Sequence, residues 1–131
     1  MARNNTPEAC ARQHGAVVAL ATVYNGSAPG ANTNILTTSL KVSESACAIR
    51  ITVCLTTGSV FNMQTTDGTT AYVNGLNGST ALNAGDVYTF TVGARRYSSQ
   101  TGTTELSYNF QVETDSVIRF LFVEEVTGPV V

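Results

Sequence analysis

The residue types that could carry chemistry in this 131-residue chain are few and scattered. His14 is the only histidine, and it lies in a polar segment near the start of the sequence. A Ser-His-Asp or Cys-His arrangement needs a histidine that a rigid scaffold holds beside its nucleophile. The sequence also contains no CxxC, HExxH or calcium-loop spacing. We therefore predict no catalytic residue, no metal site and no cofactor, and we expect that the protein is not an enzyme.

The acidic pair Glu124-Glu125 stands near the end of a long apolar run. Adjacent residues of a strand point to opposite faces of a sheet, so these carboxylates cannot act together on one bond as glycosidase carboxylates do. We expect one of them to meet solvent and the other to pair with an arginine, either Arg50 or Arg119. Asp86 follows a glycine and is predicted to be a turn residue.

One loop has a distinct composition, because Arg95, Arg96 and Tyr97 follow one another and precede the polar residues 98–104. Arginine and tyrosine are enriched at protein interfaces. The alternatives are a solvated hairpin loop and a contact with another subunit or a ligand. These three residues are therefore interface candidates.

Residues 1–15 are too polar to contribute much to a core, and we expect them to form a flexible N-terminal arm. The arm is either a frayed terminus or a segment that becomes ordered on a neighbouring subunit. Arg3 and Arg12 can make charge-assisted contacts with carboxylates of such a neighbour. Cys10 is a further interface candidate: it can reach Cys47 or Cys54 of its own chain, or a thiol of another subunit, with which it would form an intermolecular disulfide.

The chain has three cysteines, so at least one thiol has no partner within the chain. Cys47 and Cys54 belong to one predicted strand and lie about 23 Å apart at ~3.3 Å per residue. A disulfide needs Cα atoms within about 7 Å, so these two cannot pair with each other. Cys47 is expected to be a buried free thiol.

Three apolar runs in the second half of the chain are predicted to organise the fold. Residues 87–92 and 106–112 alternate between apolar and polar side chains, as half-buried strands do. Residues 117–126 are apolar on both parities, which predicts a central strand that is covered on both sides. On this interpretation Phe120 is a core residue, and Phe120→Ala costs about 3–5 kcal/mol.

Upstream, five further apolar runs bounded by glycine, asparagine and aspartate complete the pattern. They are residues 16–24, 34–42, 47–55, 60–64 and 71–73. Short strands with a turn about every 8–12 residues, and no segment of helical period, predict an all-β fold: a single antiparallel β-sandwich, jelly-roll-like. The expected domains are the arm at 1–15 and the sandwich at 16–131.

The composition of charged residues limits the classes of partner that the protein can bind. The net charge is −2 and Lys41 is the only lysine, so the basic stripe that a nucleic-acid binder needs is missing. No apolar segment is long enough to span a membrane, and residues 1–14 lack the apolar core of a signal peptide, so we expect synthesis in a cytoplasm. Only 12% of the residues are charged, which leaves little repulsion between copies of the chain and favours packing against neighbours.

The segment 76–90, LNGSTALNAGDVYTF, followed by SYNFQ at 107–111 and LFVEEV at 121–126, resembles small virion proteins of tailed bacteriophages, including capsid decoration or cement proteins. The resemblance covers about the second half of the chain. The loop at 93–104 is longer than that pattern usually has, and no catalytic residues are carried over.

The resemblance implies a β-sandwich that binds the outside of a capsid as a homo-oligomer, most simply a trimer, and stabilises it. Its partners would be the major capsid protein and copies of itself, and its location the virion. The alternatives are a receptor- or glycan-binding module of a head or tail fibre, and a neck or tail component. Tyr72 and Tyr97 are the aromatic residues that a sugar site would use.

Overall fold

A computed structural model describes the chain over residues 17–23, 26–41, 46–66, 70–93 and 107–127. These residues form short strands joined by turns, with one 3-10 turn between the fifth and sixth strands. In chain order the elements are β1 (Val17–Val23), β2 (Leu40–Lys41), β3 (Ala46–Leu55), β4 (Phe61–Thr66), β5 (Ala71–Gly75), η1 (Asn77–Ser79), β6 (Val87–Gly93), β7 (Ser107–Val112) and β8 (Ile118–Thr127).

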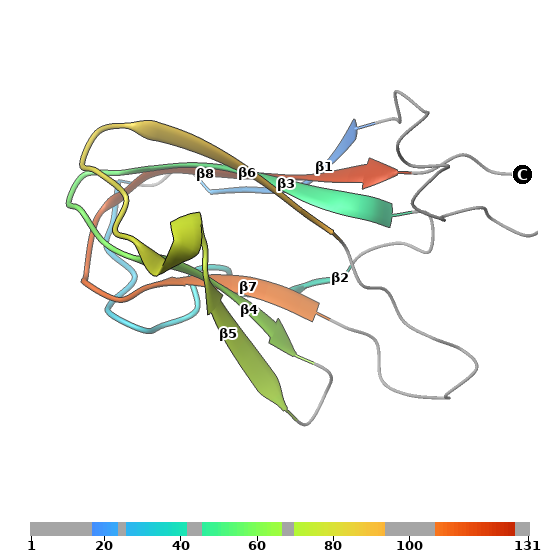
Figure 1. Cartoon of the computed structure of the whole chain (residues 1–131), viewed down its shortest axis with the longest axis horizontal. Coiled ribbons are helices and arrows are strands. Elements are labelled where there is room, and N and C mark those ends of the chain that lie inside the picture. The colour runs from blue at the N-terminus through green and yellow to red at the C-terminus, as the bar shows by residue number, and fades with distance from the viewer. Residues whose placement is uncertain (1–16, 24–25, 42–45, 67–69, 94–106, 128–131) are drawn as a thin grey trace, which may run out of the picture.

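The strands form two antiparallel four-stranded sheets that face each other (Figure 1). The first sheet has the order β1-β8-β3-β6 and the second the order β2-β7-β4-β5. Successive strands mostly alternate between the sheets, and only the β4–β5 hairpin keeps two consecutive strands in one sheet. The predicted all-β sandwich is confirmed.

The last strand lies inside its sheet, as predicted. β8 pairs with β1 on one side and with β3 on the other. Its side chains Leu121 and Val123 lie opposite Val53 and Ile51 of β3 on the face that looks toward the second sheet. The long apolar run at 117–126 thus supplies a strand that is paired on both edges.

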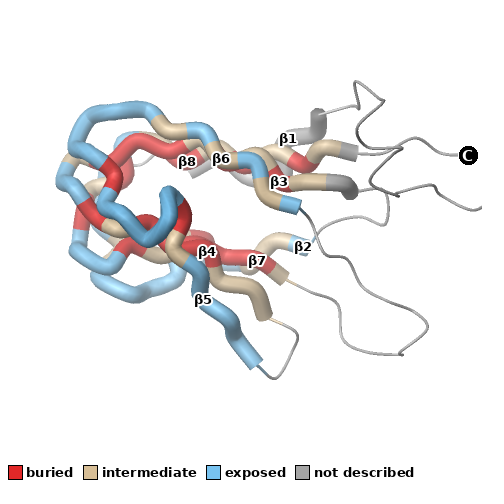
Figure 2. The backbone as a smooth tube through the Cα atoms, in the orientation of Figure 1, coloured by how far each residue is buried: buried red, intermediate tan, exposed pale blue. Residues whose placement is uncertain are grey.

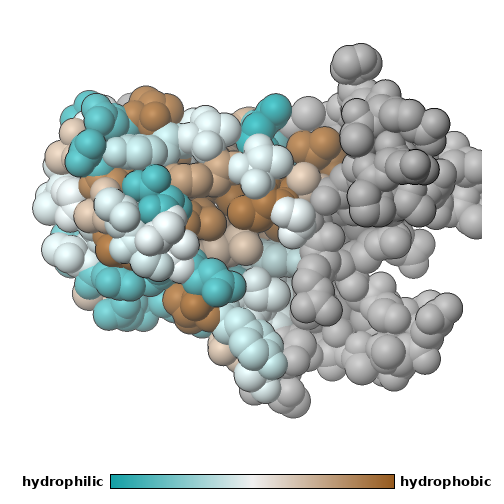
Figure 3. Space-filling view, viewed as in Figure 1, coloured by the Kyte–Doolittle hydropathy of each residue, from teal (hydrophilic) through white to brown (hydrophobic). Residues whose placement is uncertain are grey.

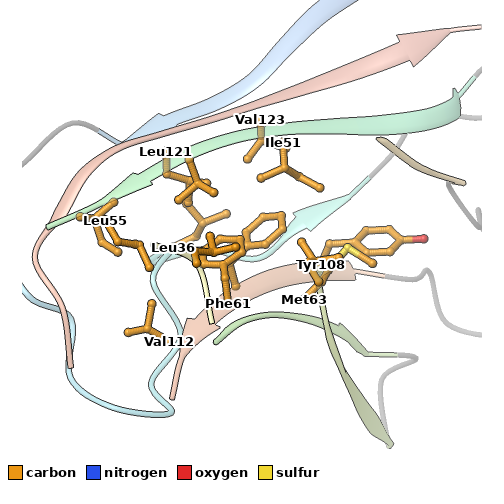
Figure 4. Close-up of a cluster of buried hydrophobic side chains, with 14 of the residues drawn as sticks. Leu36, Ile51, Leu55, Phe61, Met63, Tyr108, Val112, Leu121 and Val123 are labelled. Carbon is orange, nitrogen blue, oxygen red and sulfur yellow. The ribbon is translucent and has the colours of Figure 1, made fainter. Parts of the chain in front are cut away.

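The core lies between the two sheets (Figures 2 and 4). The buried side chains of the first sheet are mainly aliphatic, and the second sheet adds three aromatic side chains together with Met63 and Val112. The rings of Phe61 and Phe110 stack with centroids 5.7 Å apart. Most of the fully buried residues come from the predicted parity of their run, and Ile118 and Leu82 are the exceptions. The largest are Tyr108, Phe61, Phe110, Ile49, Ile51, Leu55, Leu82, Ile118, Leu121, Val53, Val112 and Val123.

Phe120 was wrongly expected to belong to this core. Cys54 of β3 lies opposite Phe120 and Leu55 lies opposite Ile118, so Arg119 is an extra residue with no counterpart on β3. Such a β-bulge shifts the alternation of side chains by one residue. Ile118 therefore joins Leu121 on the inner face, whereas Phe120 lies on the outer face and is only partly buried.

The predicted strand at 34–42 was also largely wrong, since β2 comprises only Leu40 and Lys41. The chain before it runs along β7 with irregular hydrogen bonds, from the Asn32 N–H to the Val112 carbonyl and from the Ile35 N–H to the Phe110 carbonyl. Asn32 has a positive φ of 53°, which interrupts a regular ladder. This segment runs irregularly along the edge of β7 and does not form a regular strand there.

Asn109 of β7 fastens that segment. Its side-chain oxygen accepts the Leu36 N–H at 3.0 Å, and its amide nitrogen donates to the Leu36 carbonyl and to the Ser39 hydroxyl, also at 3.0 Å. Asn109 is 2% exposed although it points away from the core. The segment beside β7 thus buries the Asn109 side chain and satisfies its hydrogen bonds.

No helix among the described residues has the length and apolar character that crossing a bilayer requires.

Candidate interaction surface

The outward face of the first sheet has the most unusual composition in the described part of the chain. Phe120 and Phe122 of β8 stand on this face, opposite Cys54 and Thr52 of β3. On the other side of β3, Val87 and Thr89 of β6 continue the same rows, and Val87 is strongly exposed. Figure 1 shows no labelled element lying over this side of the sheet. We refer to the surface formed by Thr52, Cys54, Val87, Thr89, Phe120 and Phe122 as the outer patch.

Cys54 is the one thiol whose surroundings the structure describes. It is free and only 1% exposed, although it points away from the core. Its cross-strand neighbours are Val87 and Phe120, whose larger side chains flank it on both sides. Because a buried thiol of this kind behaves as a small apolar residue, Cys54 adds to the apolar character of the patch.

The charges beside the outer patch neutralise each other. Arg50 and Glu124 are cross-strand partners, with the guanidinium Nε 3.1 Å from Oε1 and a second bond of 3.3 Å from the other side of the fork to Oε2. The hydrogen bond and the charge of Glu124 raise the pKa of Arg50. This confirms the expectation that one of the two adjacent glutamates pairs with an arginine.

The second glutamate was expected to meet solvent, and this is wrong. Glu125 lies opposite Ile49, on the inner face of the sheet, and is 4% exposed. Glu124 and Glu125 therefore do point to opposite faces, as the strand period requires. The two carboxylates cannot meet on one substrate, so the structure offers no general acid and base here.

The remaining described polar side chains mainly hold turns in place. The Asn62 amide donates to the Glu113 carboxylate at 3.1 Å, and Asp115 accepts the Gly30 N–H at 3.0 Å. Ser116 bonds both the N–H and the carbonyl of Thr57. Within the described residues no three histidine, cysteine, aspartate or glutamate side chains gather as a metal site would need.

On the side of the sandwich that faces the viewer in Figure 3, β6 and β5 are the edge strands of their sheets, and the sheets diverge there. Hydrophobic surface is visible between them (Figure 3). Phe90 and Val92 of β6 pack against the core but remain partly exposed at this side. Tyr88 stacks on Phe90 at 6.1 Å, and its hydroxyl accepts the Asn83 N–H at 2.9 Å.

β5 is the most exposed strand among those whose side chains are described. The residues from Ala71 to Asn74 are all exposed, with Tyr72 at 56% and Val73 at 49%. Since Tyr72 and Val73 point to opposite faces, neither face of β5 is covered. Figure 2 shows this strand running away from the first sheet.

Most residues that the sequence singled out as sites lie outside the described part of the chain. This holds for His14, for the disulfide candidate and for every interface candidate: Arg3, Cys10, Arg12, Arg95, Arg96 and Tyr97. Their roles stay predictions. Tyr72, which the sequence offered for a sugar site, is described and exposed.

The outer patch was not predicted as a site. Its signal was present, because residues 117–126 are apolar on both parities. We interpreted that pattern as burial on both sides of the strand. The structure shows only one side facing the other sheet, so the second apolar parity forms surface.

Comparisons of the chain with protein-family models, curated proteins and solved structures found no match, so its function must be argued from its own residues.

Proposed function

We propose that this protein is a structural subunit whose outer patch binds another protein, and that its setting is the capsid surface of a tailed bacteriophage. In this proposal it is a decoration or cement protein that stabilises the particle. The single observation that carries the binding role is the composition of the outer patch. The resemblance of residues 76–90, 107–111 and 121–126 to small virion proteins supports the setting.

The patch has the chemistry of the centre of a protein interface. Such centres are depleted in charge and enriched in aromatic residues. Here Phe120 and Phe122 supply the aromatic area, and Thr52 and Thr89 bond each other across strands at 3.4 Å. Arg50 and Glu124 satisfy each other at its margin. A neutral partner surface could therefore cover the patch without leaving a charge buried and unpaired.

The partners in this proposal are the major capsid protein and further copies of the chain, with a trimer as the expected unit. The interface candidates outside the described residues, among them Arg95 and Cys10, would add further contacts. A virion location with synthesis in the host cytoplasm follows from the proposal.

The test compares phage particles that contain the protein with particles that lack it. Both should assemble, and those without the protein should lose infectivity at a lower temperature. Particles carrying the double variant Phe120→Ser/Phe122→Ser should resemble the deletion, whereas a Thr33→Ser control, at an exposed position elsewhere, should resemble wild type. Deletion particles as heat-tolerant as wild type would contradict the proposal.

A receptor- or glycan-binding role is the second candidate, and exposure of Tyr72 favours it. Asn74 points to the same face of β5, so an aromatic ring and an amide are presented together. Glycan-array binding that Tyr72→Ala abolishes, together with failed host adsorption and normal particle stability, would support this role over capsid stabilisation. A neck or tail component differs from a decoration protein in where its density lies in the particle.

A further inference from the structure

The direction of the backbone groups on β5 follows from one hydrogen bond. The Leu76 N–H donates to the Phe61 carbonyl at 2.9 Å, in register with the β4–β5 ladder. Directly opposed residues of an antiparallel pair alternate between hydrogen-bonded and non-hydrogen-bonded positions. The next hydrogen-bonded positions on β5 are therefore Asn74 and Tyr72, whose N–H and carbonyl groups point to β4.

The neighbouring residues Ala71 and Val73 consequently point their N–H and carbonyl groups to the free edge of the sheet. The other side of β4 agrees with this alternation, because the Glu113 N–H donates to the Val60 carbonyl in the β4–β7 register. Within the described residues no strand pairs with the outer edge of β5. The edge therefore presents a row of donors and acceptors at the spacing of a β-ladder.

Nothing on β5 protects that edge. Natural sheet proteins block free edges with charged residues, proline or bulges, since an open edge pairs with other strands. Residues 70–75 contain no charge and no proline, and the β4–β5 register has no shift. Both faces are open, so an added strand would meet no covering segment among the described residues.

We propose that β5 pairs with β5 of a second copy of this chain, antiparallel and about a two-fold axis, so that the second sheets of two copies join into one. A two-fold contact brings the same groups from both sides, and an antiparallel strand pair matches each donor with an acceptor. The absence of charge on β5 means that self-pairing brings no like charges together.

The register of the proposed β5–β5 pair follows from the alternation of backbone directions along β5 and from the position of η1. Residues whose N–H and carbonyl groups point to the free edge must lie opposite residues of the same kind in the second copy. Such residues alternate along β5, so the two-fold axis passes beside a residue and not between two residues. At the Gly75 end, η1 folds back so closely that Ser79 leaves no room for a side chain on Gly75. An axis at Tyr72 keeps the contact clear of η1. It pairs Ala71 with Val73 of the second copy, and it places the two Tyr72 rings side by side.

This contact would cover surface that a monomer leaves in water. Directly opposite side chains at a non-hydrogen-bonded position are the closest in an antiparallel ladder, and aromatic pairs there are favourable. A single short edge buries little area, so we expect weak pairing that is strengthened where copies are held close together. The inference does not depend on the capsid setting.

The experiment is sedimentation velocity of the full chain over a wide concentration range. Wild type should show a concentration-dependent pairing step. Val73→Lys should weaken that step several-fold, because the two added charges then lie diagonally across the axis on the same face of the joined sheet. Thr80→Lys adds the same charge at an exposed position outside β5 and should associate as wild type does.

Proline variants give a second readout, because their effect depends on the direction in which the lost N–H points. Val73→Pro removes an N–H that points to the free edge, so it should fold and lose pairing. Asn74→Pro removes an N–H that points to β4, so it should lower the melting temperature. If Val73→Pro does not fold, Val73→Lys decides. A wild type that shows no pairing step, or a Val73→Lys chain that pairs as strongly as wild type, would overturn the proposal.

Discussion

The outward faces of the two sheets differ in which side chains they carry and in how far these side chains are buried. On the outward side of β7 the Asn109 side chain is buried, and it bonds Leu36 and Ser39 of the segment that runs along the edge of this strand. On β8 the first sheet presents Phe120 and Phe122 partly to solvent. A buried and hydrogen-bonded polar side chain thus lies on the outward side of the second sheet, whereas an aromatic pair stays partly exposed on the outward side of the first.

This difference shows which side of the sandwich is available for binding. A covered face with satisfied hydrogen bonds contributes to the stability of the isolated chain. An open face with aromatic side chains gains its stabilisation only when a second surface excludes water from it. The following variants separate these two contributions.

The largest effect is expected between the two sides of β8. Leu121→Ala removes a fully buried side chain and should lower the free energy of unfolding by about 2–5 kcal/mol. Phe120→Ala removes a larger but partly exposed side chain and should cost only about 1 kcal/mol in the isolated chain. Urea denaturation measures both. Equal losses would mean that the outer side of β8 is covered as well as the inner side.

The next largest effect is expected at the buried Asn109 side chain of β7. Asn109→Ala leaves the N–H and carbonyl of Leu36 without their partner in a buried place, and should cost about 2–4 kcal/mol. Gln111→Ala is the matched control on the same strand, since it removes only the exposed 2.8 Å bond to Asn34. That control should change stability by less than about 0.5 kcal/mol. A mild effect of Asn109→Ala would show that the segment beside β7 does not depend on it.

The smallest effect is expected at the ion pair beside the outer patch. Arg50→Gln should lower the melting temperature slightly at low salt, and the difference should vanish at about 1 M salt, where the screening length is about 3 Å. Because Glu124 raises the pKa of Arg50, this contribution is complete below the ordinary arginine pKa. It is lost only as the pH rises through the higher folded value. Differential scanning calorimetry should therefore give the same difference at neutral and at moderately alkaline pH.

Much of the fold could be predicted because its strands keep a two-residue period. The runs at 47–55 and 87–92 bury the parity that their sequences indicate. The bulge at Arg119 could not be predicted in this way, since one extra residue moves Phe120 and Ile118 to different faces without changing the composition of the run. The outer patch was missed for another reason, because apolar character on both parities of residues 117–126 was interpreted as burial on both sides of the strand.

The prediction of a strand at residues 34–42 was largely wrong for a different reason. The modest alternation of this stretch indicated a strand, but a positive φ at Asn32 and the side-chain bonds of Asn109 hold it as an irregular segment along the edge of β7. These are long-range contacts, and a local pattern does not contain them. Glu125 is similar, because its position on β8 predicts its face but not that this face is buried at that point.

The central claim is that a protein partner covers the outer patch, and side-chain footprinting tests it most directly. Hydroxyl-radical oxidation of Phe120 and Phe122 should be compared between the free chain and the phage particle proposed to contain it. Tyr108, which is buried in the core, gives the baseline for a protected aromatic side chain. We expect oxidation of Phe120 and Phe122 to fall several-fold in the particle, toward the rate of Tyr108. Unchanged oxidation of both phenylalanines in the particle would contradict the claim.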